Sequence, residues 1–158
     1  MYHYYLLLGS NLDPREKLIL KAIKKLVFLG KVVGVSSFYE SESWGFVSNK
    51  FLNKLLVIIS EKKPLEMLNS TQYIEKKLGR ERDNGKYIAR KIDIDILFID
   101  NLVVNTKKLM VTHPKLHLRR FALLPLLEID KNKSHPVFRK TIKELLVECE
   151  DKLQVKKI

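Results

Sequence analysis

The sequence has very little cysteine. Cys149 is the only cysteine among 158 residues, so the chain cannot form an internal disulfide. Two glutamates flank it, and neighbouring negative charge does not favour a reactive thiolate. The chain is long enough to bury one continuous core but too short for two well-stabilised ones. We therefore predict a single domain over residues 1–158 that folds in a reducing compartment without disulfides or a structural metal.

Long hydrophobic runs are also missing. The apolar stretch at residues 2–8 ends at Gly9, and no basic leader precedes it. No other stretch approaches the roughly 20 apolar residues that a membrane helix needs. These absences predict a cytoplasmic protein with no membrane partner.

Negative charge is scarce. The chain has 18 acidic and 30 basic residues, which gives a formal net charge of +12. Such an excess predicts an anionic partner, which can be nucleic acid, an acidic membrane surface or a phosphorylated small molecule, unless the lysines simply cover solvated faces. The arginines are less evenly spread, because five of the seven lie between positions 80 and 120. Arginine binds phosphate through a planar, bidentate fork, so this clustering favours a phosphorylated ligand.

Hydrophobic periodicity and turn signals divide the chain into strands and helices. Strands are predicted at residues 2–8, 31–40, 51–60 and 91–100, where apolar, β-branched and aromatic residues gather. Helices are predicted from Asp13 to Gly30 and from Pro64 to Gly79, each with an apolar stripe at helical spacing. After residue 100 we expect a short strand near 103–111, a leucine-rich helical segment at 119–128, and a last helix that begins at a capping box of Thr141 and Glu144.

The order of the first six elements is strand, helix, strand, strand, helix, strand. This βαββαβ order is that of the ferredoxin-like fold, an α+β architecture in which an antiparallel sheet carries both helices on one face. We therefore predict a ferredoxin-like βαββαβ core, with helices packed on the sheet, followed by a C-terminal helical extension.

The stretch RKIDIDILF at residues 90–98 carries the most informative chemical signal. In a strand, the apolar residues at positions 92, 94, 96 and 98 point to one face, whereas Asp93 and Asp95 share the other with Cα atoms about 6.5–7 Å apart. Two close carboxylates on a hydrophobic strand repel each other and lose hydration unless a cation lies between them. Their hard oxygen atoms favour Mg²⁺. The alternative is an exposed edge strand whose acids face water or pair with lysines.

Five basic residues lie in the 13 positions that precede this acid pair. They are Arg80, Arg82, Lys86, Arg90 and Lys91. A triphosphate bridged to two metal ions needs this combination, because cations bind its peripheral oxygens while carboxylates hold the metal. There is no glycine-rich Walker loop, so the phosphates must be held in another way.

Several motifs resemble, in their order along the chain, those of the 6-hydroxymethyl-7,8-dihydropterin pyrophosphokinase family. They are LGSNL at 8–12, VSSFY at 35–39, FLN at 51–53, QYIEKKLGR at 72–80, RKIDIDIL at 90–97, HP at 113–114, RRF at 119–121 and LPL at 124–126. The resemblance implies a ferredoxin-like fold and an enzyme of folate biosynthesis. That enzyme would use two Mg²⁺ ions to transfer the diphosphoryl group of ATP to the pterin and would release AMP.

The resemblance also implies roles for single residues. Asp93 and Asp95 would hold the two Mg²⁺ ions, and Arg80, Arg90 and Asp95 would be catalytic. ATP would be bound by Gln72, Glu75, Arg80, Arg82, Arg90, Ile96, Lys108, His113 and Arg119. The pterin would be bound by Gly9, Ser41, Glu42, Trp44, Phe51, Asn53 and Phe121, with the two phenylalanines stacking on its ring. The implied protein is a monomer whose partners are these two small molecules and no nucleic acid.

The chain departs from the family pattern at several positions. Phe51 stands where many relatives have tyrosine, and Lys108 where some have arginine. Residues 87–89 replace a Trp-Gly-Pro run, Pro114 replaces an aromatic residue, and residues 41–45 differ from a proline-rich version. These departures fall on both the nucleotide and the pterin side of the implied site.

Two other functions fit parts of the pattern. A two-metal nucleotidyl transferase or cyclase also places an acid pair on a ferredoxin-like sheet, but it acts at the α-phosphorus of ATP. A ferredoxin-like RNA-binding module fits the basic charge and the fold. However, the strand at 51–60 lacks a series of stacking aromatics, and Asp93 and Asp95 would repel an RNA phosphate.

Residues 80–90 have a distinct composition. They have almost nothing to bury, contain an Asn84-Gly85 turn signal and carry four cations that repel one another until a polyanion binds. We expect this loop to be a mobile lid that orders over the active site when both nucleotide and acceptor are bound.

Overall fold

The computed structural model describes residues 1–45, 47–79, 82–83, 86–87 and 92–158. The first half of the chain forms β1 (Tyr2–Ser10), α1 (Arg15–Leu26), β2 (Lys31–Val35), β3 (Tyr39–Ser41), β4 (Phe51–Ser60) and α2 (Pro64–Lys77). The second half forms β5 (Arg82–Asp83), β6 (Lys86–Tyr87), β7 (Asp93–Ile99), β8 (Val104–Asn105), β9 (Met110–Val111), the 3-10 helix η1 (Leu116–Leu118), α3 (Arg120–Ile129), α4 (Ile142–Glu148) and β10 (Val155–Lys157).

The main sheet has the strand order β10-β3-β4-β1-β7, and β2 pairs with the second half of β4. All of its pairings are antiparallel. β1 lies between β4 and β7, and it pairs with β4 from Tyr2 opposite Ser60 to Ser10 opposite Leu52. β1 is buried from Tyr4 to Ser10, and because helices cover both faces of the sheet, its sequence is an almost unbroken apolar run.

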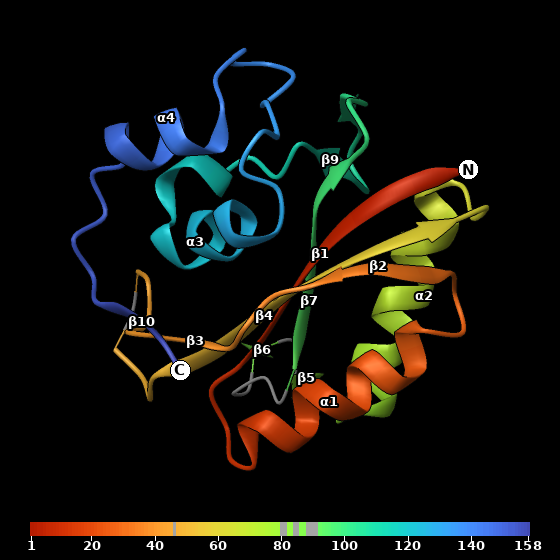
Figure 1. Ribbon diagram of the computed structural model, residues 1–158. Coiled ribbons are helices and arrows are strands. Elements are labelled where there is room, and N and C mark those ends of the chain that lie inside the picture. The colour runs from red at the N-terminus through yellow and green to blue at the C-terminus, as the bar shows by residue number, and fades with distance from the viewer. Residues whose placement is uncertain (46, 80–81, 84–85, 88–91) are drawn as a thin grey trace.

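Helices cover both faces of the sheet. α1 and α2 lie on one face, whereas α3 and α4 lie on the other (Figure 1). Alternate side chains of β1 serve the two cores: Leu6 and Leu8 pack in the cluster that includes α1 and α2, and Leu7 packs in the cluster that includes α3 and α4. The structure confirms the predicted ferredoxin-like core, and the C-terminal extension supplies the helices of the second face.

Some predicted elements differ in detail. The helix predicted from Asp13 to Gly30 is shorter, because α1 begins at Arg15 after Pro14 as its N-cap and ends at Leu26. The strand predicted at 31–40 is divided into β2 and β3, the one predicted near 103–111 is a hairpin of two short strands, and β10 was not predicted. The capping box of Thr141 and Glu144 is confirmed, because the Thr141 hydroxyl accepts from the Glu144 N–H at the start of α4.

The alternation predicted for β7 holds only as far as Leu97. Ile92, Ile94 and Ile96 pack on the α1 and α2 side as expected, but Phe98 packs on the other side. The cause is a β-bulge: Leu6 pairs with Ile96 and Tyr5 with Phe98, so Leu97 is an extra residue without a partner on β1. The prediction that Phe98 shares a face with the three isoleucines is therefore wrong.

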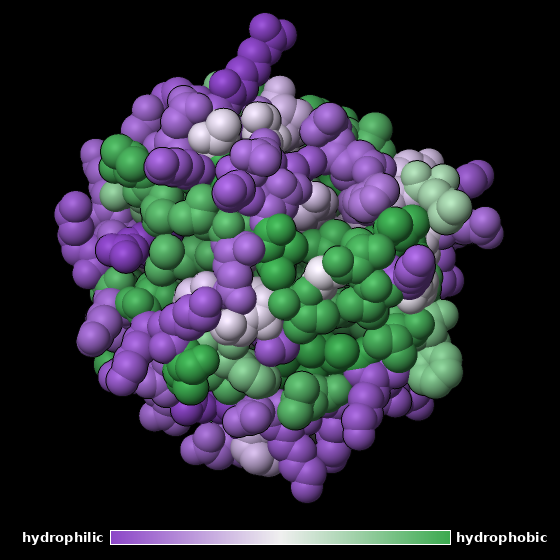
Figure 2. Space-filling view, viewed as in Figure 1, coloured by the Kyte–Doolittle hydropathy of each residue, from purple (hydrophilic) through white to green (hydrophobic). Residues whose placement is uncertain are grey.

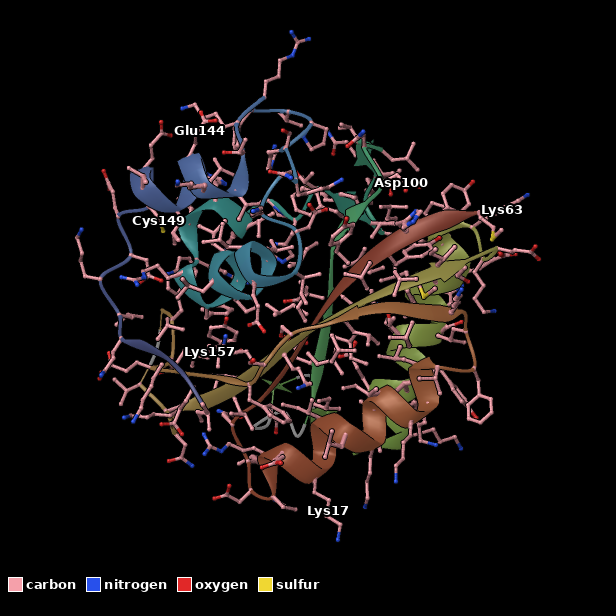
Figure 3. The ribbon with its side chains drawn as sticks, viewed as in Figure 1. Lys17, Lys63, Asp100, Glu144, Cys149 and Lys157 are labelled. Atoms are coloured by element: carbon pink, nitrogen blue, oxygen red, sulfur yellow. The ribbon has the colours of Figure 1, made fainter. Side chains whose placement is uncertain are left out.

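The surface of the described chain is mixed. Lysines are spread widely, as Lys17, Lys63 and Lys157 show in Figure 3, rather than gathered on one face. Figure 2 shows apolar side chains over α1 and β2, where Leu20, Val27, Phe28, Val33 and Val35 are exposed. Among the described residues, no helix combines the length and apolar character needed to cross a membrane.

The predicted lid falls largely outside the described residues. Arg80 and Arg90 are not among them, and Arg82 is described only through its backbone, which pairs with Tyr87 across positions 84 and 85. The lid therefore stays a prediction.

Candidate active site

The site is built on a row of residues that crosses four strands of the sheet. Gly9 on β1 lies opposite Asn53 on β4 and opposite Asp93 on β7, and Asn53 lies opposite Tyr39 on β3. Asp95 follows two residues after Asp93, opposite Leu7. Because side chains alternate along a strand, Asn53, Asp93 and Asp95 share the face of Leu7, which is the face covered by α3.

Asn53 is held rigidly at the centre of this row. Its side chain is only 2% exposed, and its amide nitrogen donates to the Ser41 hydroxyl at 2.8 Å and to the Tyr39 carbonyl at 3.2 Å. The carboxamide oxygen points toward Gly9, since a Cβ atom at position 9 would lie 3.3 Å from it. The Phe51 ring would be 3.9 Å from the same Cβ atom. A small residue at position 9 therefore keeps a space open beside Asn53 and Phe51.

Asp95 faces two nitrogen-bearing side chains that come from the segment after β9. Its Oδ2 atom lies 4.0 Å from His113 Nε2 and 4.0 Å from Arg119 Nη1. The backbone N–H of His113 donates to the carbonyl of Leu97 at 3.1 Å, which fixes the segment against β7. The carboxylates of β7 are thus adjacent to a histidine and an arginine that are 18 and 24 residues further along the chain.

His113 is held in its neutral form. Burial, together with the positive charge of Arg119, lowers the pKa of His113 to about 4. Its Nδ1 atom accepts from the backbone N–H of Lys115 at 3.2 Å. The proton of the neutral ring therefore lies on Nε2, the nitrogen that faces Asp95.

Arg119 lies among aromatic rings. Its guanidinium carbon is 4.8 Å from the centre of the Trp44 ring and 5.5 Å from that of Phe121. Both distances are within the range of cation–π attraction. Burial lowers the pKa of Arg119, although Asp95 and Asp93 oppose this effect. The Nε atom is buried and has no hydrogen-bond partner among the described residues.

Comparison with known proteins identifies the family. Residues 5–131 match the family described as 7,8-dihydro-6-hydroxymethylpterin-pyrophosphokinase (HPPK). The chain belongs to this family. The HPPK of Aquifex aeolicus, named 2-amino-4-hydroxy-6-hydroxymethyldihydropteridine pyrophosphokinase, is 44% identical over 141 residues, which cover 89% of this chain and 88% of that protein. The Bacillus subtilis protein of the same name is 38% identical over 128 residues, which cover 79% of this chain and 76% of that one.

Solved structures agree on the fold. The crystal structure of Plasmodium falciparum HPPK-DHPS wild type with SDX-DHP has a TM-score of 0.74 over 93% of this chain, at 19% identity. This chain covers 44% of the Plasmodium chain. The likeness confirms the ferredoxin-like HPPK fold, and the family match confirms the family predicted from the sequence motifs.

The acid pair suits the magnesium ions that the sequence motifs predict. Magnesium is bound in many nucleotide enzymes by one or two carboxylates, with substrate phosphates and water completing its shell. Asp93 and Asp95 supply oxygen ligands of this kind on one face of β7, and the Asp95 side chain is 29% exposed, which leaves it accessible. Among the described residues no group of three or more histidines, cysteines or acids forms a closed metal cage. The donor set fits a metal shared with a substrate rather than a structural ion.

Other residues predicted to bind ATP lie away from this face. Gln72 is exposed and Glu75 is 2% exposed on α2, and the Ile96 side chain packs in the core beneath α1 and α2. A ligand that contacts both α2 and Asp95 would have to pass around β7, the edge strand of the sheet. Contact between Ile96 and such a ligand would involve its main chain. Lys108 is exposed in the loop between β8 and β9.

The predicted pterin residues are mostly brought together. Ser41 is bonded to Asn53 and pairs with Phe51, and Phe121 and Trp44 both lie beside Arg119. Glu42 differs, because its side chain is exposed just beyond β3.

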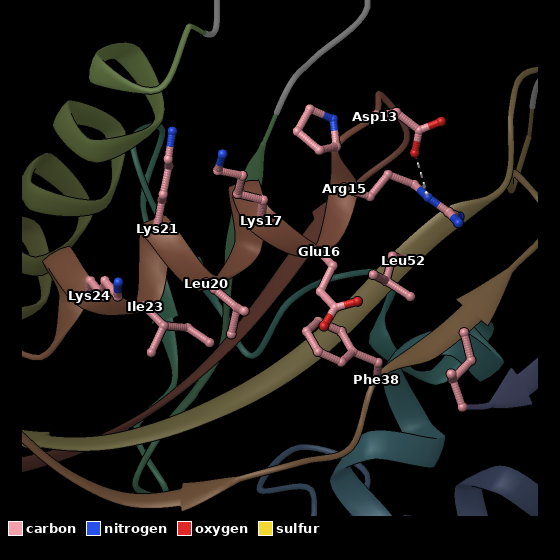
Figure 4. A pocket seen from close by; sticks show the side chains of 12 residues that line it. Asp13, Arg15, Glu16, Lys17, Leu20, Lys21, Ile23, Lys24, Phe38 and Leu52 are labelled. Carbon is pink, nitrogen blue, oxygen red and sulfur yellow. Dashed lines mark ion pairs between the residues drawn. The ribbon is translucent and has the colours of Figure 1, made fainter.

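A groove elsewhere on the molecule is separate from the site. It has a volume of about 760 Å³, and Figure 4 shows Leu20 and Ile23 of α1 on one side, with Phe38 and Leu52 on the other. None of the residues predicted to bind ATP, metal or pterin lines it.

Sequence reasoning missed residues that support the site. Lys115 lies 5.7 Å from the centre of the Trp44 ring, and its charge helps to keep His113 neutral. The sequence signal that could have identified Lys115 is its position two residues after His113. Thr112 and His135 are hydrogen-bonded to each other behind His113, and no local motif marks that contact.

Proposed function

We propose that this protein transfers the diphosphoryl group of ATP to the hydroxymethyl group of 6-hydroxymethyl-7,8-dihydropterin in folate biosynthesis, giving AMP and the pterin diphosphate. The observation that carries the proposal is the row of Asn53, Gly9 and Asp93 across three neighbouring strands. A rigid amide for a heterocycle thus lies directly beside a pair of carboxylates for a metal-bound polyphosphate. Membership of the HPPK family agrees with this arrangement.

The pterin side of the site is set by Asn53. Both protons of its amide nitrogen point to internal acceptors, so the carboxamide oxygen is the atom available to accept from an amino or imino group of the pterin. Phe51 and Phe121 would stack on the flat ring, with Trp44 and Ser41 closing the pocket. Glu42 would contact the pterin at the edge of the pocket. Because Arg119 lies against both Trp44 and Phe121 in the structure, it would move toward the phosphates as the pterin enters.

On the phosphate side, Asp93 and Asp95 would hold two Mg²⁺ ions. When bound, these ions neutralise charge on the phosphate oxygens and draw them toward the acceptor. Arg119 and the neutral His113, which lie next to Asp95, would bind phosphate oxygens. Arg80, Arg82 and Arg90 would add further charge, and Gln72, Glu75, Ile96 and Lys108 would contact the nucleotide around the edge of β7.

The reaction that this arrangement supports is a single displacement at the β-phosphorus. The pterin hydroxymethyl oxygen forms a bond to that phosphorus, and the bond to the oxygen that bridges the α- and β-phosphates breaks. The electron pair leaves with AMP, and the hydroxyl proton passes to solvent or to a phosphate oxygen. Positioning and charge neutralisation provide most of the acceleration, so a strong general base is not required.

We further propose that residues 1–158 act as one domain and as a monomer in the cytoplasm, without nucleic acid or membrane. The support for a single domain is that both hydrophobic core clusters pack on the same main sheet. A single cysteine and the use of ATP fit a reducing, nucleotide-rich compartment.

The test is an assay for AMP release with purified protein. We expect AMP and the pterin diphosphate in equal amounts, and only when ATP, 6-hydroxymethyl-7,8-dihydropterin and Mg²⁺ are all present. Omission of each component in turn provides the controls. ATP labelled at the α-phosphate separates the proposal from a nucleotidyl transferase or cyclase, because those enzymes retain the label in a nucleotide adduct and release diphosphate. Release of diphosphate in place of AMP would overturn the proposal.

A further inference from the structure

His135 is buried in the loop between α3 and α4. It is 2% exposed, its backbone N–H donates to the Lys140 carbonyl at 2.8 Å, and its own carbonyl accepts from the Arg139 N–H at 2.8 Å. Its ring stacks on Phe138 with 4.4 Å between centres and meets the edge of Phe98 at 5.9 Å. The imidazole is therefore fixed in position and orientation by its own loop and by β7.

The two ring nitrogens of His135 have different partners. Nδ1 accepts from the backbone N–H groups of Val137 at 3.2 Å and Phe138 at 3.1 Å. A nitrogen that accepts two N–H bonds carries no proton, so the ring proton lies on Nε2. Nε2 is 2.9 Å from the Thr112 hydroxyl oxygen and donates to it. Nδ1 thus organises the local turn, whereas Nε2 links this loop to a segment 23 residues earlier in the chain.

Thr112 immediately precedes the histidine of the candidate site. The peptide that joins them carries the N–H that His113 donates to Leu97 on β7. Two anchors therefore fix this peptide, one to the bulge of β7 and one to His135. The His113 ring extends from it, with Nε2 at 4.0 Å from Asp95.

We propose that His135 is a positioning residue for the nucleotide side of the site. It holds Thr112 through Nε2, and this contact sets the direction in which His113 faces Asp95. The inference rests on the proposed function, because it assigns His113 to the phosphate side. His135 itself touches no reacting group, and its influence passes through Thr112.

The chemistry of the two nitrogens provides matched variants. In His135→Asn the side-chain oxygen stands in the place of Nδ1, so the local turn is kept but the donor to Thr112 is lost. In His135→Gln the terminal amide reaches the place of Nε2 and can still donate to Thr112. Thr112→Val removes the acceptor and keeps the β-branched shape. His117→Asn is the control, because the His117 ring also packs on Phe138, at 4.7 Å, but lies outside this link.

The first measurement is steady-state kinetics. We expect His135→Asn and Thr112→Val each to lower kcat/KM for ATP by about tenfold, with a much smaller effect on the KM for the pterin. The double variant should lose no more than either single variant, because both remove the same contact. His135→Gln should recover most of the activity, and His117→Asn should match the wild type. Additive losses, or wild-type kinetics in His135→Asn, would overturn the proposal.

The second measurement does not depend on turnover. In ¹H–¹⁵N spectra of the imidazole rings, the His113 signals should shift in His135→Asn and Thr112→Val and remain unchanged in His117→Asn. Unchanged His113 signals in both link variants would overturn the positioning role even if the enzyme is active. If the wild type releases no AMP while these shifts occur, the proposed function fails and the positioning of His113 by His135 stands.

Discussion

The buried His135 makes the stability of this protein sensitive to pH. Burial, together with the nearby His117, lowers the pKa of His135 to about 4. In the unfolded chain the ring takes up a proton near its ordinary pKa of about 6.5. Acid therefore favours the unfolded state. The contribution of the neutral ring is fully present above pH 6.5 and is lost as the pH falls toward 4.

The magnitude follows from the two pKa values. A decrease from 6.5 to about 4 corresponds to about 3 kcal/mol of unfolding free energy when the loss is complete. Between pH 7 and pH 5 the same linkage gives a loss of about 2 kcal/mol. This is a large share of the 5–15 kcal/mol that is typical of small domains. Protonation would also oblige Nδ1 to donate, although the two backbone N–H groups that face it are donors themselves.

The assay is urea unfolding of the wild type and His135→Gln at pH 5, 6 and 7. Glutamine does not titrate in this range, so the wild type should lose about 2 kcal/mol more than the variant between pH 7 and pH 5. The titration of other groups contributes equally to both proteins and therefore cancels in this difference. Glu128 is an example. Burial raises its pKa, but the hydrogen bonds from Tyr39 and Ser37 outweigh this effect and lower the pKa below its ordinary value. Protonation of Glu128 in acid therefore also removes native interactions. Parallel curves for the two proteins would refute the reasoning.

Three further predictions concern the site. Asp93→Ala and Asp95→Ala should each abolish AMP release, because each removes a metal ligand. The urea midpoint should stay the same or rise, because each variant also removes one of two like charges. Near-normal turnover at saturating Mg²⁺ would contradict the metal assignment. Phe121→Ala should weaken pterin binding far more than ATP binding in calorimetry, by about 1 kcal/mol or more from lost stacking, whereas equal losses would indicate a packing role alone. Gly9→Ala should raise the pterin Kd about tenfold or more with little change in the ATP Kd, since the alanine methyl group would lie 3.3 Å from the Asn53 oxygen. An unchanged pterin Kd would show that the pterin does not use this space.

The local parts of the fold could be predicted from the sequence. Asp93 and Asp95 share a face because a regular strand alternates, and β7 is regular as far as Ile96. The same rule failed at Phe98, because a bulge has no clear signature in a run of apolar residues. Short strands such as β10 are equally hard to predict, since their pairing partner supplies most of their stability.

The features that could not be predicted from the sequence depend on contacts between distant segments of the chain. The motifs indicated that Gly9, Asn53 and Asp93 belong to one site, but only the register of β1 with its two neighbours shows that they lie side by side. The hydrogen bond from His135 to Thr112 depends on how a loop closes, and neither residue stands in a recognisable pattern. A histidine before a proline gives no indication of which of its ring nitrogens will donate a hydrogen bond and which will accept one.

The bulge at Leu97 also determines where β7 can lose a residue. Before it, residues at odd positions face α3, and after it the parity is reversed, so Phe98 reaches the same side as Asp93 and Asp95. That reversal places the Phe98 ring against His135. Loss of Leu97 would place Phe98 directly after Ile96 in a regular strand, so Phe98 would still lie opposite Tyr5 and face α3. Deletion of Leu97 should therefore be tolerated better than deletion of Ile94, which would put Asp93 and Asp95 on opposite faces of the sheet.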